Sequence, residues 1–162
     1  IADWQLQPTL CSPKQALEFS NVLENINYNL PLPVHIKLDT GMSRLGTNWQ
    51  EAAEFVQLVQ GLPRLYITSI YSHLATADSP DTRVMTEQHR RFEKVIALIK
   101  AKGIKIPALH LANSAATLTD AALHYDMVRV GLAIYGLYPA IHLQNQIKLK
   151  PDLQVKIGRA HV

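Results

Sequence analysis

The sequence is poor in several features, and each shortage narrows what the protein can be. It holds one cysteine, Cys11, which excludes an intrachain disulfide framework and a cysteine-based zinc site and fits a reducing compartment. No apolar run approaches the roughly 20 residues that span a bilayer. Lysine and arginine are scattered through a chain of net charge +3, so no basic stripe indicates nucleic acid. We therefore expect a cytoplasmic protein with neither a membrane nor a nucleic acid as its partner.

The absent glycine-rich motifs bear on the function of the chain, and its two ends bear on the limits of the predicted domain. Neither GxGxxG nor GxxxxGKS/T follows a predicted strand, which weakens the case for nucleotide binding. The sequence opens on Ile1 rather than methionine, so we expect the true N-terminus to lie upstream. Residues 157–162 follow no periodic pattern and read like a translated sequencing adapter, which predicts a non-native tail, with a native polar tail as the alternative. Residues 1–156 form the predicted domain, because a chain with 48% hydrophobic residues can bury a core.

Five stretches have the composition of β-strands, and helical patterns separate them. The predicted strands cover residues 6–11, 34–39, 65–74, 107–112 and 127–137. The predicted helices cover about 13–26, 48–61, 83–102 and 115–123. Strands that alternate with helices form a parallel sheet with right-handed crossovers. This order suits two folds, a doubly wound sheet or part of an eight-stranded barrel.

The stretch VHIKLDTGMSRLG at residues 34–46 is the most informative part of the chain. Apolar and polar residues alternate over 34–39, as in a strand with two different faces. Lys37 and Asp39 lie on the polar face, and Arg44 follows a tight turn. An ordinary solvent-facing antiparallel strand would show the same alternation. The charged cluster favours a ligand site instead, because ligands bind at the carboxyl ends of parallel strands.

Polar residues recur at the ends of the later strands. They are His73, then Asn113 and Ser114, then Arg129. A (β/α)8 barrel builds its active site in this way, from the ends of several strands, but a complete barrel needs about 250 residues. The residues therefore predict an α/β fold that is a partial (β/α)8 TIM-type barrel of about five parallel strands.

Four stretches carry a resemblance to a known family. They are HIKLDTGMSRLG at 35–46, YSHLATAD at 71–78, HLANSAATL at 110–118 and DMVRVGLAIYGLYP at 126–139. In this order, they resemble the alanine racemase family, fold-type III enzymes that depend on pyridoxal 5′-phosphate. The resemblance implies part of the N-terminal barrel of an isomerase that interconverts L- and D-alanine and supplies D-alanine for peptidoglycan. It also implies a homodimer in the full-length form.

By this resemblance, Arg129 is the arginine that hydrogen-bonds the pyridine nitrogen of the cofactor. A guanidinium has only donors and is not deprotonated in proteins, so it keeps the ring nitrogen unprotonated and weakens the ring as an electron sink. Such a site favours racemisation over transamination or elimination. The structural alternative is an arginine at a strand end that pairs with Asp126 or Asp120.

The resemblance assigns the cofactor's phosphate to Ser114 and to the backbone amides of Gly131 and Leu132. A hydroxyl and N–H groups beside a glycine form an anion cradle. The structural alternative for Ser114 is a helix N-cap, and the two roles are compatible. Asn113 is expected to touch the cofactor or to order its loop.

Three further residues receive roles in the same way. His73 is expected beneath the cofactor ring and in contact with Arg129, with a purely structural histidine as the alternative. Arg44 is expected near the phenolic oxygen of the cofactor, where it also steadies the substrate carboxylate. Lys37 matches a lysine that is carbamylated in several family members, and the resulting anion can pair with Arg44. Without that modification another group must offset the two cations, and Asp39 is the candidate unless it accepts backbone N–H bonds of its own turn.

The resemblance also places part of the catalytic machinery outside this sequence. The Schiff-base lysine is expected upstream of Ile1, and a C-terminal β-domain with a catalytic tyrosine is absent, so we expect this chain alone to be inactive. A broad-specificity or serine racemase and a non-catalytic pyridoxal-phosphate carrier barrel are the alternative functions. His89, His110, His124 and His142 share no metal-ligand spacing, and we predict no metal site.

Overall fold

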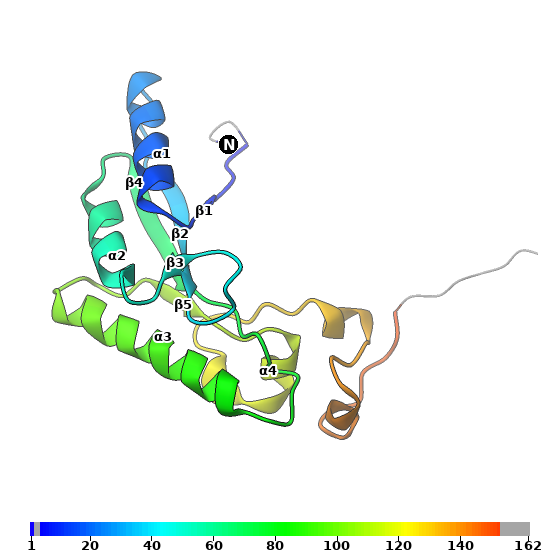
Figure 1. The fold of residues 1–162 in the computed structure, drawn as a ribbon. Coiled ribbons are helices and arrows are strands. Elements are labelled where there is room, and N and C mark those ends of the chain that lie inside the picture. Colours follow the sequence, from blue (N-terminus) through cyan, green and yellow to red (C-terminus); the bar gives the residue numbers. More distant parts are fainter. Residues whose placement is uncertain (2–3, 153–162) are drawn as a thin grey trace, which may run out of the picture.

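The computed structural model describes residues 1 and 4–152, and its centre is a parallel β-sheet (Figure 1). The strands are β1 (Thr9–Leu10), β2 (Leu32–Asp39), β3 (Thr47–Asn48), β4 (Leu65–Tyr71) and β5 (Ala108–His110). They lie in the order β1-β2-β4-β5, with β3 paired to β2 outside this path, and every pair is parallel. The predicted parallel α/β architecture is confirmed.

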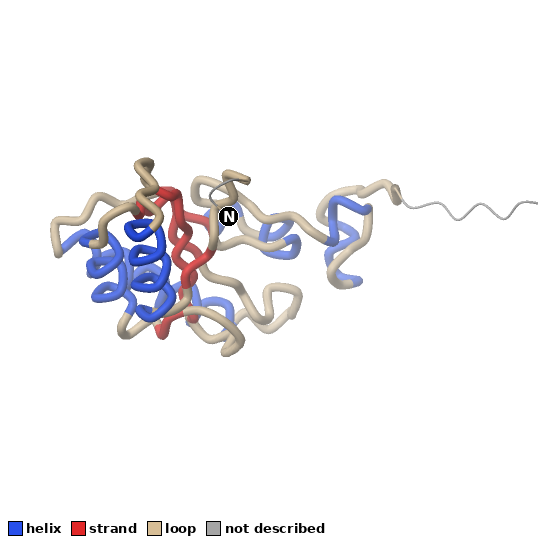
Figure 2. The backbone as a smooth tube through the Cα atoms, turned by 90° about the horizontal axis from the view of Figure 1, so that it is seen from above, coloured by secondary structure: helices blue, strands red, loops and turns tan. Residues whose placement is uncertain are grey.

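Helices connect the strands and cover one face of the sheet. The α-helices are α1 (Pro13–Asn25), α2 (Ala52–Gly61), α3 (Arg83–Ala101) and α4 (Ser114–Thr119). Three 3-10 turns follow, η1 (Ala121–Leu123), η2 (Leu132–Tyr135) and η3 (Ile141–Asn145). Figure 2 shows the long helices gathered on one side of the strands, with loops and short helical turns on the other. Each step along β1-β2-β4-β5 thus passes through one long helix, as a parallel crossover requires.

The alternation in β2 decides which of its residues meet the helices. Val34, Ile36 and Leu38 are completely buried and share one core with Phe55 of α2 and Phe92 of α3. Side chains of a strand point alternately to its two faces. The polar residues of β2 therefore lie on the face that the long helices leave free.

Local signals explain where two of the helices begin and end. The Ser12 hydroxyl caps α1 by accepting from the backbone N–H of Gln15 at 3.3 Å. Helix α3 stops before Gly103, whose φ of +73° suits a residue without a side chain. The helix predicted over about 13–26 is one residue too long, because Ile26 lies at the C-cap of α1 and is 59% exposed.

The strand predicted over residues 127–137 is wrong. Residues 127–130 have no regular structure, and Leu132–Tyr135 forms the turn η2, which ends at Gly136 with a left-handed φ of +76°. Backbone N–H groups of Asp126 and Arg129 still donate to carbonyls in and just after β5, so the stretch runs beside that strand only at its start. A strand needs an extended backbone at each residue, whereas this stretch closes short local hydrogen bonds, such as that from the Ile134 N–H to the carbonyl oxygen of Gly131 at 3.1 Å.

The second helix begins later than predicted, and the short strand β3 was not predicted. Asn48 belongs to β3, and its side chain accepts from the backbone N–H of Gln50 at 3.0 Å, which closes a turn. Helix α2 then starts at Ala52, with Glu51 at its N-cap and no side-chain capping bond. Turns and N-caps use the same polar residue types, so the two patterns look alike in sequence. Three other strands are shorter than predicted, with the bounds given above.

Some predictions concern the ends of the chain and its composition. The domain limit at 156 and the predicted tail at 157–162 lie outside the described residues. Within residues 1 and 4–152, no helix combines the length and apolar character needed to cross a membrane. The same described part contains no group of three or more His, Cys, Asp or Glu side chains that could hold a metal ion.

Candidate functional site

Six of the predicted site residues line one cavity of about 390 Å³. They are His73, Asn113, Ser114, Arg129, Gly131 and Leu132. The first follows β4, the next two follow β5, and the last three belong to the stretch that replaces the predicted fifth strand. Parallel strands bring their carboxyl ends to one edge of the sheet, which is why residues far apart in sequence meet here.

Arg129 is fixed in the wall of this cavity by both of its terminal nitrogens. Nη1 donates to Nδ1 of His110 at 2.6 Å, and Nη2 donates to the carbonyl oxygen of Ser72 at 2.6 Å. A longer bond joins Nη2 to the carbonyl oxygen of Leu111 at 3.3 Å. No hydrogen bond from Nε is found within the described residues, which leaves this donor for a ligand.

No carboxylate pairs with Arg129 in the described part of the chain. Asp126 instead accepts from the backbone N–H of Leu109 at 2.7 Å, and Asp120 accepts from the N–H of Ala122 at 2.9 Å. The alternative in which one of these aspartates pairs with Arg129 is therefore wrong. Burial lowers the pKa of Arg129, but a guanidinium stays charged in proteins. Asp78 also lines the cavity, but it forms no ion pair with Arg129 within the described residues. The cavity thus contains a cation that no carboxylate contacts directly.

His110 is the site residue that sequence reasoning missed. It ends β5 with only 3% of its surface exposed, and Tyr71 stacks on its ring with a centroid distance of 4.5 Å. The guanidinium carbon of Arg129 lies 5.0 Å from the centre of the same tyrosine ring. Burial, followed by the charge of Arg129, lowers the pKa of His110 to about 4. The strand predicted over 107–112 placed His110 inside the strand, and its position at the strand end became visible only with the observed bounds of β5.

Ser114 and the backbone amides near Gly131 form a second polar part of the cavity, which is uncharged, unlike the Arg129 guanidinium. The buried Ser114 hydroxyl accepts from the amides of Gly131 and Ala133 at 3.0 and 3.3 Å. The N-cap of α4 is Asn113, so the alternative role of Ser114 as N-cap is wrong. A Cβ added at Gly131 would meet no atom within 4 Å, so the space beside this amide is open.

Lys37 lies near the cavity on the free face of the sheet. It is 6% exposed, and its Nζ has no hydrogen-bond partner among the described residues. Its Nζ lies over the ring of Tyr71, 5.5 Å from the ring centre. Burial is the main cause that lowers the pKa of Lys37, and the charges of Arg129 and Arg44 lower it further. Burying an amine without a hydrogen-bond partner costs folding free energy, so a ligand or a modification at this nitrogen would relieve that cost.

Asp39 and Arg44 take different positions relative to the cavity. Asp39 accepts from two backbone N–H groups of its own turn, at 3.0 and 2.9 Å, which is the structural role left open by the sequence. Arg44 is exposed in the loop after β2 and does not line the cavity. Its charge contributes to the lowered pKa values of Lys37 and His73, so it lies within electrostatic reach of both.

His73 makes a long contact with Arg129 and is held mainly through its backbone. Its Nδ1 lies 3.5 Å from Nη2 of Arg129. Its carbonyl oxygen accepts from Nε2 of the buried Gln88 at 3.0 Å, and the same Gln88 accepts from the N–H of Ala75 at 2.8 Å. Burial, and then the charge of Arg129, lower the pKa of His73. The predicted contact between the two side chains is present, but it is weak.

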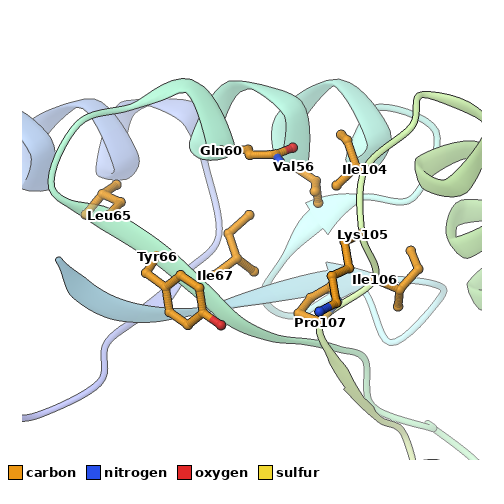
Figure 3. A pocket seen from close by; sticks show the side chains of 9 residues that line it. All are labelled: Val56, Gln60, Leu65, Tyr66, Ile67, Ile104, Lys105, Ile106 and Pro107. Carbon is orange, nitrogen blue, oxygen red and sulfur yellow. The ribbon is translucent and has the colours of Figure 1, made fainter.

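A second cavity, of about 260 Å³, lies at the opposite ends of the strands (Figure 3). Side chains of α2, of the start of β4 and of residues 104–107 line it, and Lys105 is the one charged residue among them. None of the predicted site residues is present there. Ligands of parallel α/β proteins bind at the carboxyl ends, so we place the functional site in the cavity around Arg129.

The site suits a flat ligand that carries an anionic group. Arg129 presents donors to an acceptor such as a ring nitrogen. Ser114 and the amides near Gly131 present a hydroxyl and N–H groups that suit a phosphate. Pyridoxal 5′-phosphate combines a basic ring nitrogen with a phosphate, so the residues present fit this cofactor.

The chain is similar to alanine racemases along nearly its whole length. Residues 1–139 match the family model "Alanine racemase, N-terminal domain". The chain is 73% identical over its full length to an alanine racemase from Nostoc, of which it covers 42%. It is 60% identical over 96% of its length to an alanine racemase from Synechocystis, of which it covers 41%.

The fold is also similar to that of solved alanine racemases. The solved structure of the Clostridium difficile alanine racemase in complex with cycloserine matches 88% of this chain with a TM-score of 0.83 and 26% sequence identity, and the match covers 39% of that structure. The predicted partial barrel is therefore confirmed. The chain spans about two fifths of the length of the curated relatives that it matches. With its sequence matched over 139 residues and its sheet superposed on a solved relative, the chain belongs to the alanine racemase family, as part of the N-terminal domain.

Proposed function

We propose that this chain is the cofactor-holding part of an alanine racemase that uses pyridoxal 5′-phosphate to interconvert L- and D-alanine. One observation carries the proposal: a single cavity combines the unpaired Arg129 guanidinium with the hydroxyl of Ser114 and the open space at Gly131. Membership of the family supports the same reaction. The relative that binds cycloserine supports a small substrate.

In this proposal each cavity residue holds a different part of the cofactor. Arg129 donates to the ring nitrogen, and Ser114 with the amides of Gly131 and Leu132 binds the phosphate. The Gly131 N–H donates to the Ser114 hydroxyl in this structure, so it exchanges that acceptor for a phosphate oxygen when the cofactor binds. The Leu132 N–H makes no hydrogen bond within the described residues, so it is available to an anion. Asn113 keeps the loop in place through its cap on α4 and a bond of 3.3 Å to the carbonyl of Leu74.

The choice of arginine at the ring nitrogen decides which reactions the site favours. When bound, the cofactor withdraws electrons from the α-carbon of an amino acid, so that its α-proton can leave. Arg129 cannot give up its proton, so the ring nitrogen stays unprotonated and withdraws electrons only moderately. Return of a proton to the α-carbon is then favoured over side reactions. Arg44, exposed beside the cavity, is placed to attract the substrate carboxylate.

We extend the proposal to a carbamate on Lys37. The lowered pKa of this buried amine raises its neutral fraction at neutral pH, and only the neutral amine reacts with carbon dioxide. The nitrogen lone pair forms a bond to the carbon of CO2, one C=O electron pair moves to oxygen, and a proton leaves to solvent. The product is an anion, and its negative charge is attracted by the positive charges of Arg129 and Arg44. The modification thus replaces a buried Nζ that has no hydrogen-bond partner with a group that can form ion pairs.

The wider assignment follows from family membership alone. We place the full-length protein in the cytoplasm as a homodimer that supplies D-alanine for peptidoglycan.

A chimera tests the proposed reaction. In it, this chain replaces the matching segment of the Nostoc alanine racemase, which is 73% identical. We expect the chimera to convert L-alanine to D-alanine, and the Arg129→Lys variant to lose roughly 10- to 100-fold in kcat/KM, because lysine cannot make the forked hydrogen bonds.

The matched control is Arg90→Lys, at an exposed arginine that pairs with Glu87 on α3. It should leave the rate unchanged. A folded chimera without turnover, or equal rates for the two variants, would contradict the proposal.

Mass spectrometry tests the carbamate. The intact chimera in bicarbonate buffer should gain the mass of one CO2 and lose it on acidification, and Lys37→Ala should abolish the gain and slow the reaction. Lys14→Ala, at an exposed lysine of α1, is the control and should do neither. An unmodified chimera, or a Lys37→Ala variant with the parent's rate, counts against the carbamate.

A further inference from the structure

A row of three polar side chains crosses the free face of the sheet behind Arg129. His35 of β2 pairs in register with Ser69 of β4, and their Nδ1 and Oγ atoms are 2.6 Å apart. The same Ser69 oxygen lies 2.8 Å from Nε2 of His110 on β5. The other ring nitrogen of His110 contacts Arg129. The four side chains therefore form one continuous chain of hydrogen bonds.

The donors and acceptors in this chain can be assigned from its Arg129 end. An arginine has only donors, so His110 must accept at Nδ1 and carries its proton on Nε2. That N–H donates to the oxygen of Ser69. The Ser69 hydroxyl, 2% exposed, has one proton to donate, and the acceptor within reach is Nδ1 of His35. All the bonds then point one way, from Arg129 to His35.

We propose that Ser69 and His35 are positioning residues that lock His110 in its Nε2–H tautomer and thereby hold the Arg129 guanidinium in place. Neither residue touches the cavity itself. Their effect on catalysis rests on the proposed racemase function, whereas their effect on His110 does not.

The opposite tautomer shows why the lock matters. With its proton on Nδ1, His110 would present an N–H group to an N–H group of Arg129 at a nitrogen–nitrogen distance of 2.6 Å. This contact would break, and the guanidinium would lose one of its two short bonds. Ser69 prevents the change by giving the Nε2 proton an acceptor, and His35 completes the arrangement by taking the serine proton.

Nuclear magnetic resonance of histidine nitrogens tests the lock directly. In the Nostoc chimera labelled with 15N-histidine, His110 should show a bare Nδ1 and a protonated Nε2 at neutral pH. In the Ser69→Ala variant the same resonances should report a mixture of tautomers. A protonated Nδ1 in the parent, or a single unchanged tautomer in Ser69→Ala, overturns the proposal.

Kinetics separate positioning from ordinary destabilisation. Ser69→Ala should lower kcat by roughly 10- to 100-fold, the effect typical of removing a partner that orients a site residue, with little change in KM. Ser69→Thr keeps the hydroxyl and should restore most of the rate. The control is Ser20→Ala, which removes an equally buried hydroxyl bonded at 2.8 Å to the carbonyl of Pro63, far from the cavity.

The outcomes distinguish this inference from the proposed function. If the folded chimera has no racemase activity but Ser69→Ala still mixes the tautomers of His110, the function fails and the lock stands. If the chimera is active and Ser69→Ala has the same kcat as Ser20→Ala, the positioning role is wrong and the function stands.

Discussion

Burial and the charge of Arg129 hold the pKa of His110 at about 4, below its ordinary value of 6.5, and this gives folding a dependence on pH. The unfolded chain takes up a proton at this residue near pH 6.5, whereas the folded protein does so only near pH 4. The free energy of unfolding therefore falls as the pH drops through this window, and above it this residue has no effect. Burial also lowers the pKa values of His35 and His73, which act in the same direction.

The His110→Gln variant tests this linkage, because glutamine keeps a donor and an acceptor but does not titrate. Urea unfolding of the chimera, followed between pH 6.5 and about 4, should show a flatter loss of stability in this variant than in the parent. His142→Gln, at an exposed histidine of η3, should keep the parent's slope. Equal slopes in all three proteins would show that the lowered pKa of His110 does not couple to folding.

At this scale the sequence predicted individual residues better than their contacts. Residues such as His73 and Ser114 stand out because each lies at the carboxyl end of a predicted strand with a polar side chain. His110 does not, because it lies inside the strand predicted over 107–112 and its partner Arg129 is 19 residues away, in a stretch with the wrong predicted structure. Its contact with Ser69 joins the neighbouring strands β4 and β5, and it could not be predicted without the register of these strands.

Helix α3 holds the loop after β4 in place at the cavity through a single buried glutamine. Gln88 is 1% exposed, and it bonds the N–H of Ala75 and the carbonyl of His73. Gln88→Leu should lower the free energy of unfolding by about 1–3 kcal/mol, because it leaves these backbone groups unpaired. Denaturant unfolding of the chimera measures the change.

The control for this substitution is Gln57→Leu on α2. Gln57 is exposed and bonds only the side chain of Lys102, so its replacement should change stability by less than about 0.5 kcal/mol. If the two variants lose the same stability, Gln88 is not the link between α3 and the loop after β4 that its contacts indicate.

The turn after β2 depends on a glycine at position 46. Gly46 has a φ of +119°, and a Cβ there would lie 2.7 Å from the carbonyl carbon of Leu38 and 2.8 Å from the nitrogen of Asp39. Gly46→Ala should therefore destabilise the protein by more than about 1 kcal/mol. Gly61→Ala, at the end of α2 with no atom within 4 Å, should not, and equal melting temperatures would contradict this reading.

Strand β2 and its turn were predictable, whereas the stretch after β5 was not. The alternation over 34–39 specifies a strand because its apolar half fills a core, and the Asp39 turn is local in sequence. Residues 127–137 have the composition of a strand, yet their backbone follows the left-handed Gly136 and a contact with Ser114. Long-range contacts of this kind leave no period in the sequence.

At the scale of the whole molecule, large apolar side chains are exposed on the segment that follows β5. Ile134 is 67% exposed, Leu137 51% and Ile141 83%. Exposed apolar groups that lie close together favour association. We expect the isolated 162-residue chain to bind a hydrophobic dye and to form soluble oligomers or aggregates, unlike the chimera. Light scattering and dye fluorescence measure this, and a monomeric chain without dye binding would contradict it.

The overall architecture was accessible from sequence because the order of strands and helices fixes a parallel sheet. The partial barrel and the family followed from strand ends and motifs, and both are confirmed. The face of the sheet that carries His35, Ser69 and His110 was not accessible, because its contacts depend on the order and register of three strands.

The central claim is that residues at the ends of β4 and β5, together with residues 129–132, bind one cofactor at its ring nitrogen and at its phosphate. A crystal structure of the chimera with pyridoxal 5′-phosphate tests it most directly. We predict the ring nitrogen at Arg129 and the phosphate at Ser114 with the amides of Gly131 and Leu132. A cofactor bound elsewhere, or one whose ring nitrogen faces a carboxylate while Arg129 points away, would contradict the claim.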